Sequence, residues 1–215
     1  MKFNFGPIRA TLMICAVGLQ LSAGSIITVF NTNNNGEADD SQMFDIAVLN
    51  PAGITITSVD VNSALGQAFG LSFALDIYIT PTTAVGEYTN PGAWTLVSTG
   101  SGVNAASDTP SFVAVSSFFL AQGTYGIAFV APTINLGYTN ATGSEVYANS
   151  DVSLDNFVST VFPPPFSGPI NDRIWNGTIN YSVGNTAVPE PGSLLLLGAA
   201  LLGLGAARAT GRVRS

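Results

Sequence analysis

Several residue types that carry chemistry in enzymes are scarce or absent in this sequence. The chain of 215 residues has no histidine and one cysteine, Cys15. Without histidine, a Ser-His-Asp triad and the usual zinc sites are excluded, and a lone cysteine excludes a disulfide within the chain. Lysine is also absent from residues 25–187, so most covalent mechanisms lack a nucleophile or a base there. We therefore expect no enzymatic activity.

Charged residues are also scarce, at 9% of the chain, and they are unevenly placed. Residues 25–187 contain 12 acidic residues against 1 basic residue, Arg173, which gives this segment a net charge of −11. Such a surface repels nucleic acid and other phosphate-bearing ligands, so we expect no nucleic-acid partner. The remaining basic residues stand near the two ends of the chain: Lys2, Arg9, Arg208, Arg212 and Arg214.

Turn residues and alternating apolar residues fill the middle of the chain, which has 23 glycines and 12 prolines and no sustained helical periodicity. Residues 71–79 alternate between Leu71, Phe73, Leu75, Ile77 and Ile79 on one face and wetter positions such as Ser72, Asp76 and Tyr78 on the other. This period of two is typical of half-buried antiparallel strands. In residues 54–61 the apolar positions change face, which predicts a β-bulge near Ser58.

The pattern predicts one all-β domain over residues 25–183, a jelly-roll-like antiparallel β-sandwich. We expect residues 121–123 to form a short hairpin loop and the proline-rich residues 162–169 to form a stiff, exposed apolar surface loop. The expected strands are residues 25–30, 43–48, 54–61, 71–79, 94–98, 112–115, 118–120, 125–129 and 175–183.

The first 24 residues have the features of a secretory signal peptide. Lys2 and Arg9 precede an apolar run over residues 10–21, and small residues follow at Ser22, Ala23 and Gly24. This order of a basic start, an apolar middle and a small-residue end predicts passage through the general secretion machinery. We expect a signal peptidase to cleave before Ser25.

The C-terminal residues 188–215 form a second processing segment, joined to the domain by a linker at 184–187. An apolar run at 194–207 is followed by Arg208, Arg212 and Arg214, which the positive-inside rule predicts to act as a membrane stop. The run is shorter than the roughly 20 residues of a standard membrane-spanning helix. Its flanking residues nevertheless favour a transmembrane helix.

The tail resembles the PEP-CTERM sorting signal of Gram-negative bacteria, through Val188, Pro189, Glu190 and Pro191, the apolar helix and the closing arginines. In that family an exosortase, a membrane enzyme, recognises the tail and cleaves near the Pro-Glu-Pro motif. The resemblance implies that Pro189, Glu190 and Pro191 are recognition residues and that exosortase and signal peptidase are partners. It also implies an exported protein that is anchored in the inner membrane before processing and then reaches the cell surface or the medium.

Residues 31–36 place Asn31, Asn33 and Asn35 with the spacing of a calcium loop and are followed by Asp39. However, Gln42 stands where such a loop needs a bidentate glutamate, so an Asn/Gly-rich turn is the interpretation we prefer. We expect no bound cofactor, and weak Ca²⁺ binding at Asp39, Asp40 and Asp45 stays open as an alternative.

Aromatic residues offer a second candidate site, a surface for stacking sugars. Trp94 and Trp175 each lie on the same strand face as nearby apolar residues, because successive side chains of a strand alternate between faces. This predicts that both are core residues. Tyr88 and Tyr138 stand next to turn residues and are the better candidates for surface ligand contacts. Segments 90–96 and 173–179 are similar to exported bacterial sandwich domains that often carry PEP-CTERM tails, a resemblance that supports the fold more than a function.

Asn140, Asn176 and Asn180 match the glycosylation sequon. The alternation of the last strand puts Asn176 and Asn180 on its outer side.

The functional hypothesis is an exported envelope or extracellular-matrix protein, sorted by exosortase and without catalytic activity. A carbohydrate-binding module acting on exopolysaccharide is the alternative, because such polymers accompany the PEP-CTERM family. A glycoside hydrolase that uses a pair of acids is the second alternative.

Overall fold

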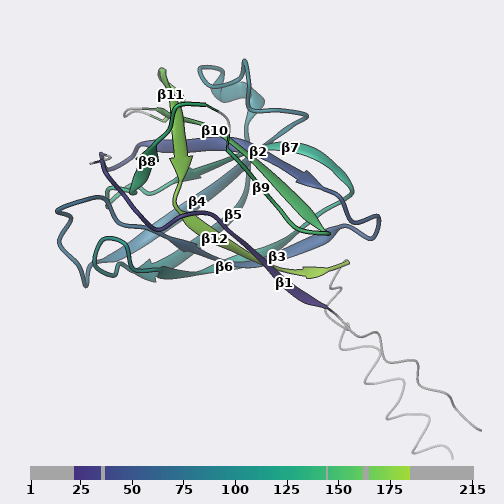
Figure 1. The fold of residues 1–215 in the computed structure, drawn as a ribbon, viewed down its shortest axis with the longest axis horizontal. Helices are drawn as coiled ribbons and strands as arrows, with labels where there is room; N and C mark the ends of the chain where they lie inside the picture. Colours follow the sequence, from purple (N-terminus) through teal and green to yellow (C-terminus); the bar gives the residue numbers. More distant parts are fainter. Residues whose placement is uncertain (1–21, 35–36, 144, 162–164, 185–215) are drawn as a thin grey trace, which may run out of the picture.

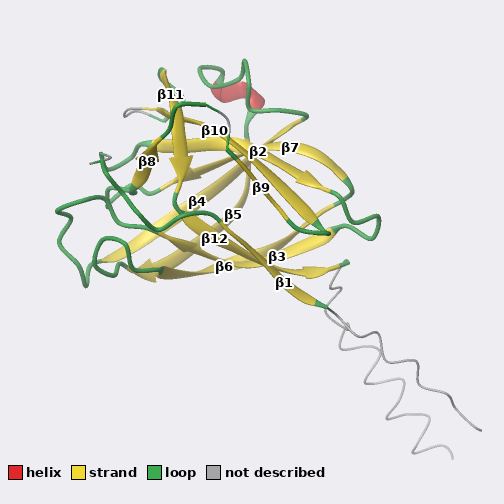
Figure 2. Cartoon of the chain, in the orientation of Figure 1, coloured by secondary structure: helices red, strands yellow, loops and turns green. Residues whose placement is uncertain are grey.

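The computed structural model describes residues 22–34, 37–143, 145–161 and 165–184. The signal segment before Ser22 and the linker and sorting tail after Gly184 lie outside the described residues, and so do the helices predicted there. Nearly all regular structure in these residues is β-strand, with one short 3-10 helix among them, η1 (Pro91–Ala93) (Figure 2). Within the described part of the chain, no helix has the length and apolar character needed to cross a membrane.

In the described residues, the domain contains twelve antiparallel strands. The first six are β1 (Ala23–Ile27), β2 (Ser41–Val48), β3 (Ile54–Val61), β4 (Ser72–Pro81), β5 (Thr95–Val103) and β6 (Ser111–Leu120). The last six are β7 (Gly123–Val130), β8 (Tyr138–Asn140), β9 (Val146–Ala148), β10 (Val152–Val161), β11 (Pro169–Trp175) and β12 (Gly177–Val183).

The strands form the two layers of a sandwich that face each other across one core (Figure 1). One layer has the order β1-β12-β3-β6, and the other has the order β5-β4-β7-β2 and continues through β10, β11 and β8. The first four strands of each layer have the order of a jelly roll, so the predicted β-sandwich is confirmed. The layers are joined along β5 and β6, which pair over only three residues each.

The inner faces of both layers follow the alternation seen in the sequence. In β4, Phe73, Leu75 and Ile77 are buried between the layers, as period two requires. Leu71 falls just before the strand and is exposed, unlike the expectation. In β3 the pairing with both neighbours shifts at Thr57, so the predicted bulge is confirmed, and it keeps apolar side chains inward on both sides of the shift.

The outer face of the second layer is covered by a flap, which we define as residues 82–94 between β4 and β5. Trp94 and Tyr88 of the flap pack with Met43 and Tyr78 of the sheet in a second apolar cluster. The alternation in the sequence had predicted that Tyr78 faces solvent. The structure shows instead that the flap packs over its side chain. Phe166 closes the cluster, with ring centroids 5.5 Å from Tyr78 and 5.4 Å from Trp94, so this part of the predicted apolar loop is partly covered.

Two connections differ from the sequence prediction. Residues 121–123 do not close a hairpin, because β6 pairs with β3 and β5 whereas β7 pairs with β2 and β4. The segment instead crosses from one layer to the other. The prediction also missed β8 to β11, which extend the second layer beyond β2.

The chain returns from β11 to β12 through a corner at Trp175, Asn176 and Gly177. Trp175 is fully buried and stacks on Phe44, with ring centroids 5.1 Å apart. A Cβ atom on Gly177 would overlap the Trp175 indole and the carbonyl oxygen of Asp60. Only glycine therefore lets the strand pass so close to the indole as it changes layer.

Candidate functional site

An open groove lies where β5 and β6 part from each other. It encloses about 440 Å³ and is lined by Thr99, Gly100, Ser101, Ala114, Val115 and Ser116. The strands come together next to the groove because Gly100 has no side chain, and a Cβ atom there would lie 2.7 Å from the carbonyl oxygen of Ala114. They separate where Ser98 donates a hydrogen bond to the carbonyl oxygen of Ser116 (2.6 Å) in place of a backbone pair.

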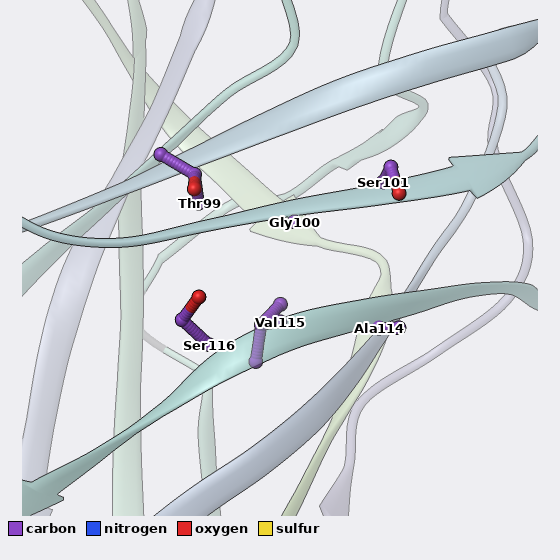
Figure 3. Close-up of a pocket in the computed structure, with 6 residues that line it drawn as sticks. All are labelled: Thr99, Gly100, Ser101, Ala114, Val115 and Ser116. Carbon is purple, nitrogen blue, oxygen red and sulfur yellow. The ribbon is translucent and has the colours of Figure 1, made fainter.

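The chemistry of this groove is neutral and rich in hydroxyl groups. Figure 3 shows Thr99 and Ser116 on facing sides of the gap, one from each strand. A neighbouring hollow of about 240 Å³ is lined by Leu96, Val97, Ser98, Thr99 and Ser116. Hydroxyl groups donate and accept hydrogen bonds, so the groove suits an uncharged polar ligand.

The tyrosines predicted to contact a ligand lie in covered positions. Tyr138 is 5% exposed, with the Arg173 guanidinium 5.6 Å from its ring centroid, so its predicted surface position is wrong. Tyr88 is half-buried against the flap cluster, and burial raises the pKa of its hydroxyl to about 12. The prediction that Trp94 and Trp175 are core residues is confirmed, at 7% and 0% exposure. Turn residues next to a tyrosine in the sequence do not show whether a segment distant in the sequence covers its ring in the fold.

The three sequon asparagines lie in different surroundings. Asn140 is exposed, and Asn180 is partly exposed, with its amide donating to Asp60 Oδ2 (3.3 Å). Asn176 is fully buried and donates to Thr139 Oγ1 (2.9 Å). Its predicted outward position is wrong, because Asn176 lies at the corner between β11 and β12. The alternation of inward and outward side chains along a strand does not continue through this corner. Glycosylation at Asn140 and Asn180 stays a prediction.

The three aspartates proposed for loose calcium binding, Asp39, Asp40 and Asp45, are not gathered into one group. Asp45 lies on the outer face of β2 and accepts hydrogen bonds from the Thr83 hydroxyl (2.6 Å) and the Ala84 N–H (2.7 Å) of the flap. Asp40 is buried, at 1% exposure. Asn35 and Gly36 of the candidate calcium loop lie outside the described residues. Within the described ranges, no three acidic side chains are grouped so as to hold a metal ion.

Burial strongly changes the titration of Asp40. Loss of solvent contact, with a smaller contribution from the negative charges of Glu37 and Asp39, raises its pKa from 3.8 to about 8. The backbone N–H of Glu37 donates to Asp40 Oδ2 (3.4 Å) and acts in the opposite direction. Within the described part of the chain, no donor forms a hydrogen bond to Asp40 Oδ1. At neutral pH this carboxyl group is therefore protonated.

Asp108 and Asp151 also serve as hydrogen-bond acceptors that tie segments together. Asp108 Oδ1 accepts from the Thr32 N–H (2.7 Å) and from the Asn62 amide (3.1 Å). Asp151 accepts from the amide of Asn50 (2.7 Å) and the hydroxyl of Tyr181 (3.2 Å).

Comparison with known proteins identifies the C-terminal segment. Residues 187–209 match the family model of the PEP-CTERM protein-sorting motif. This chain carries a PEP-CTERM sorting signal. The match contains Pro189, Glu190 and Pro191 and ends just after Arg208, whereas Arg212 and Arg214 follow it. No curated protein matches the chain.

The PEP-CTERM motif implies an exported protein that is anchored by a C-terminal membrane region before processing, with exosortase as the processing partner. All the motif residues lie outside the described residues. The last described residue, Gly184, precedes the matched segment by only two residues, Asn185 and Thr186. The sandwich and the sorting signal are thus nearly contiguous along the chain.

Proposed function

We propose that this chain is a non-enzymatic envelope or extracellular-matrix protein of a Gram-negative bacterium. In this proposal the sandwich is exported, held in the inner membrane by its tail, and released or transferred at the cell surface when exosortase cleaves near Pro189. The observation that carries the proposal is the match of residues 187–209 to the sorting motif. A sorting signal directs the exported domain to the cell surface and supplies no chemistry of its own.

The use of carboxylates in the sandwich supports a structural role. A hydrolase needs a pair of carboxyl groups that face a substrate cleft. The oxygens of Asp45, Asp108 and Asp151 are instead engaged in hydrogen bonds to the domain itself. The two grooves next to β5 are lined by no acidic residue.

Replacement of the two motif prolines tests the sorting step. The chain with Pro189→Ala and Pro191→Ala is expected to keep its tail in a host that has the matching exosortase, because alanine no longer holds the segment extended. Intact mass of protein from membrane and medium fractions measures this directly. The wild-type chain should lose the mass of the tail, and the variant should retain it in the membrane fraction.

A double variant with Pro110→Ala and Pro132→Ala is the matched control, because both of these prolines are exposed and lie outside the motif. It should be processed as the wild-type chain is. Loss of the tail from the motif variant at the wild-type rate would refute recognition through the prolines.

The groove between β5 and β6 favours a second candidate function, binding of a neutral polysaccharide such as an exopolysaccharide. Its lining hydroxyls at Thr99, Ser101 and Ser116 match the hydrogen-bonding groups of sugars. The burial of both tryptophans weighs against this function, since a sugar site usually offers an exposed aromatic face.

A polysaccharide array tests this second function. If the groove binds sugars, the purified domain should be retained, and Ser101→Leu with Ser116→Leu should abolish retention by filling the groove. Ser150→Leu, at an exposed turn elsewhere, is the control and should be retained. Failure of the wild-type domain to bind any polysaccharide would leave the envelope role as the one candidate.

A further inference from the structure

Both ends of the described chain leave the sandwich at the same end, which we call the tail end. The N–H of Val183 donates to the carbonyl oxygen of Ser22 (2.9 Å), and the N–H of Gly184 donates to that of Gly53 (2.8 Å). The two ends of the described chain therefore lie side by side (Figure 1).

The flap starts from the tail end, since Pro81 at the end of β4 pairs with Tyr125 near the start of β7. Three further connections lie at the same end: residues 49–53, 121–122 and 149–151. They contact one another, since the N–H of Leu49 donates to the carbonyl oxygen of Asp151 (2.7 Å) and the Gln122 amide donates to that of Leu49 (3.0 Å). This hydrogen bonding makes the three connections one continuous surface around the exit of the tail.

Charge is distributed unequally between the two ends of the sandwich. Asp151 is the one ionisable residue in the three tail-end connections, and both its oxygens accept hydrogen bonds. The connections at the opposite end carry three carboxylates that are not buried, Glu37, Asp39 and Asp108. An anionic lipid surface repels exposed carboxylates within a Debye length of about 10 Å. Electrostatic repulsion is therefore weaker when the tail end approaches an anionic lipid surface than when the opposite end does.

The tail end also exposes apolar side chains. Leu49 is 45% exposed and Phe119, beside the Gly53 turn, is 39% exposed. Pro51 and Ala52 are exposed at the tip of the same turn. Apolar side chains next to uncharged polar backbone are favourable at the boundary between lipid headgroups and acyl chains.

The length of the remaining chain keeps this surface close to the membrane. Nine residues, 185–193, separate Gly184 from the apolar run that begins at Leu194. Even fully extended, this segment spans at most about 35 Å. The sandwich is therefore tethered within one molecular diameter of the bilayer, and the tether leaves from the tail end.

We propose that the tail end is a membrane-facing surface, through which the anchored sandwich rests on lipid by way of Leu49, Pro51 and Ala52. The acidic end then points away from the membrane, and the groove between β5 and β6 lies along the side. This orientation rests on the membrane-anchored stage of the proposed function, and it presents the sorting motif at the lipid surface.

The test uses the full chain reconstituted through its tail into vesicles of phosphatidylethanolamine and phosphatidylglycerol. In a Cys15→Ser background, single cysteines are introduced by Ala52→Cys or Gln122→Cys at the tail end. Phe69→Cys is the control, because Phe69 is 73% exposed in the connection between β3 and β4 at the opposite end. Each cysteine is labelled with a fluorophore, and quenching by lipids with nitroxide-labelled headgroups is measured.

Quenching at positions 52 and 122 is expected to exceed that at position 69 at least threefold. Leu49→Glu should reduce quenching at position 122 by half or more, since it places a charge on the contacting surface. Equal quenching at all three positions, or quenching strongest at 69, would overturn the proposed orientation. Because no exosortase is present, these outcomes are independent of processing, which the Pro189 and Pro191 variant tests in cells.

Discussion

Asp40 shows how one buried residue couples the stability of this domain to pH. Its carboxyl group is 1% exposed and has a pKa raised to about 8, mainly by burial. Between about pH 4 and pH 8 the folded chain holds a proton that the unfolded chain has lost. The free energy of unfolding therefore falls as pH rises through this window, by at most about 6 kcal/mol, and levels off above it.

The substitution Asp40→Asn should remove this pH dependence, because the amide is neutral at every pH. At pH 8 the variant is expected to unfold at a higher temperature than the wild-type chain, and at pH 4 the two should differ little. Thermal unfolding followed by circular dichroism at pH 4, 6 and 8 measures the effect. Asp76→Asn, on the outer face of β4, is the control, and an equal gain at pH 8 in both variants would contradict this account.

At the scale of elements, the start of the flap of residues 82–94 is hydrogen-bonded to the sheet through the Asp45 carboxylate. Asp45 accepts hydrogen bonds from Thr83 and from the buried Ala84 N–H, and Trp94 closes the other end by donating from Nε1 to the carbonyl oxygen of Glu87 (2.9 Å). Loss of a charged acceptor leaves a buried donor unpaired, at a cost of about 1–3 kcal/mol.

Asp45→Ala is therefore expected to loosen the flap without unfolding the sandwich. Amide hydrogen exchange of residues 82–94 should become at least tenfold faster, whereas exchange in β3 and β12 should change little, because those strands lie in the other layer. Asp155→Ala is the matched control, since Asp155 is the exposed cross-strand neighbour of Asp45. Faster exchange in both variants would show that the flap does not depend on the Asp45 hydrogen bonds.

At the scale of the whole molecule, β1 begins earlier than the expected signal-peptide boundary. Ala23 pairs with Ser182 and Gly24 pairs with Tyr181, two residues before the predicted mature start at Ser25. Gly24 lies under the Tyr181 ring, and a Cβ atom there would be 2.6 Å from it. Residues 23 and 24 thus contribute to the contact between the first and last strands, which closes the sandwich.

A domain starting at Ser22 should be more stable than one starting at Ser25, by about 1–2 kcal/mol for the lost backbone pairs and ring contact. Chemical denaturation of residues 22–184 and 25–184, with the same added N-terminal residue on both, measures the difference. Equal midpoints would show that residues 22–24 add nothing to the fold.

The sequence by itself determined the fold class, the bulge in β3, the burial of both tryptophans and the sorting signal. Each of these depends on local order along the chain, either a period of two or a motif whose parts are contiguous. The strand order agreed with the predicted jelly roll because two layers are the economical way to bury one face of many short strands.

Only the tertiary structure decided which faces are covered and which segments meet. Tyr138 and Asn176 are buried where β8 meets the corner into β12: Tyr138 pairs with Trp175, and Asn176 donates to Thr139. No local pattern in the sequence indicates these contacts. The flap covers a sheet face whose alternation resembles that of an exposed one. The groove beside Thr99 and the shared exit of both chain ends arise from residues distant in sequence, because long-range packing, and not local periodicity, sets where strands part and where they end.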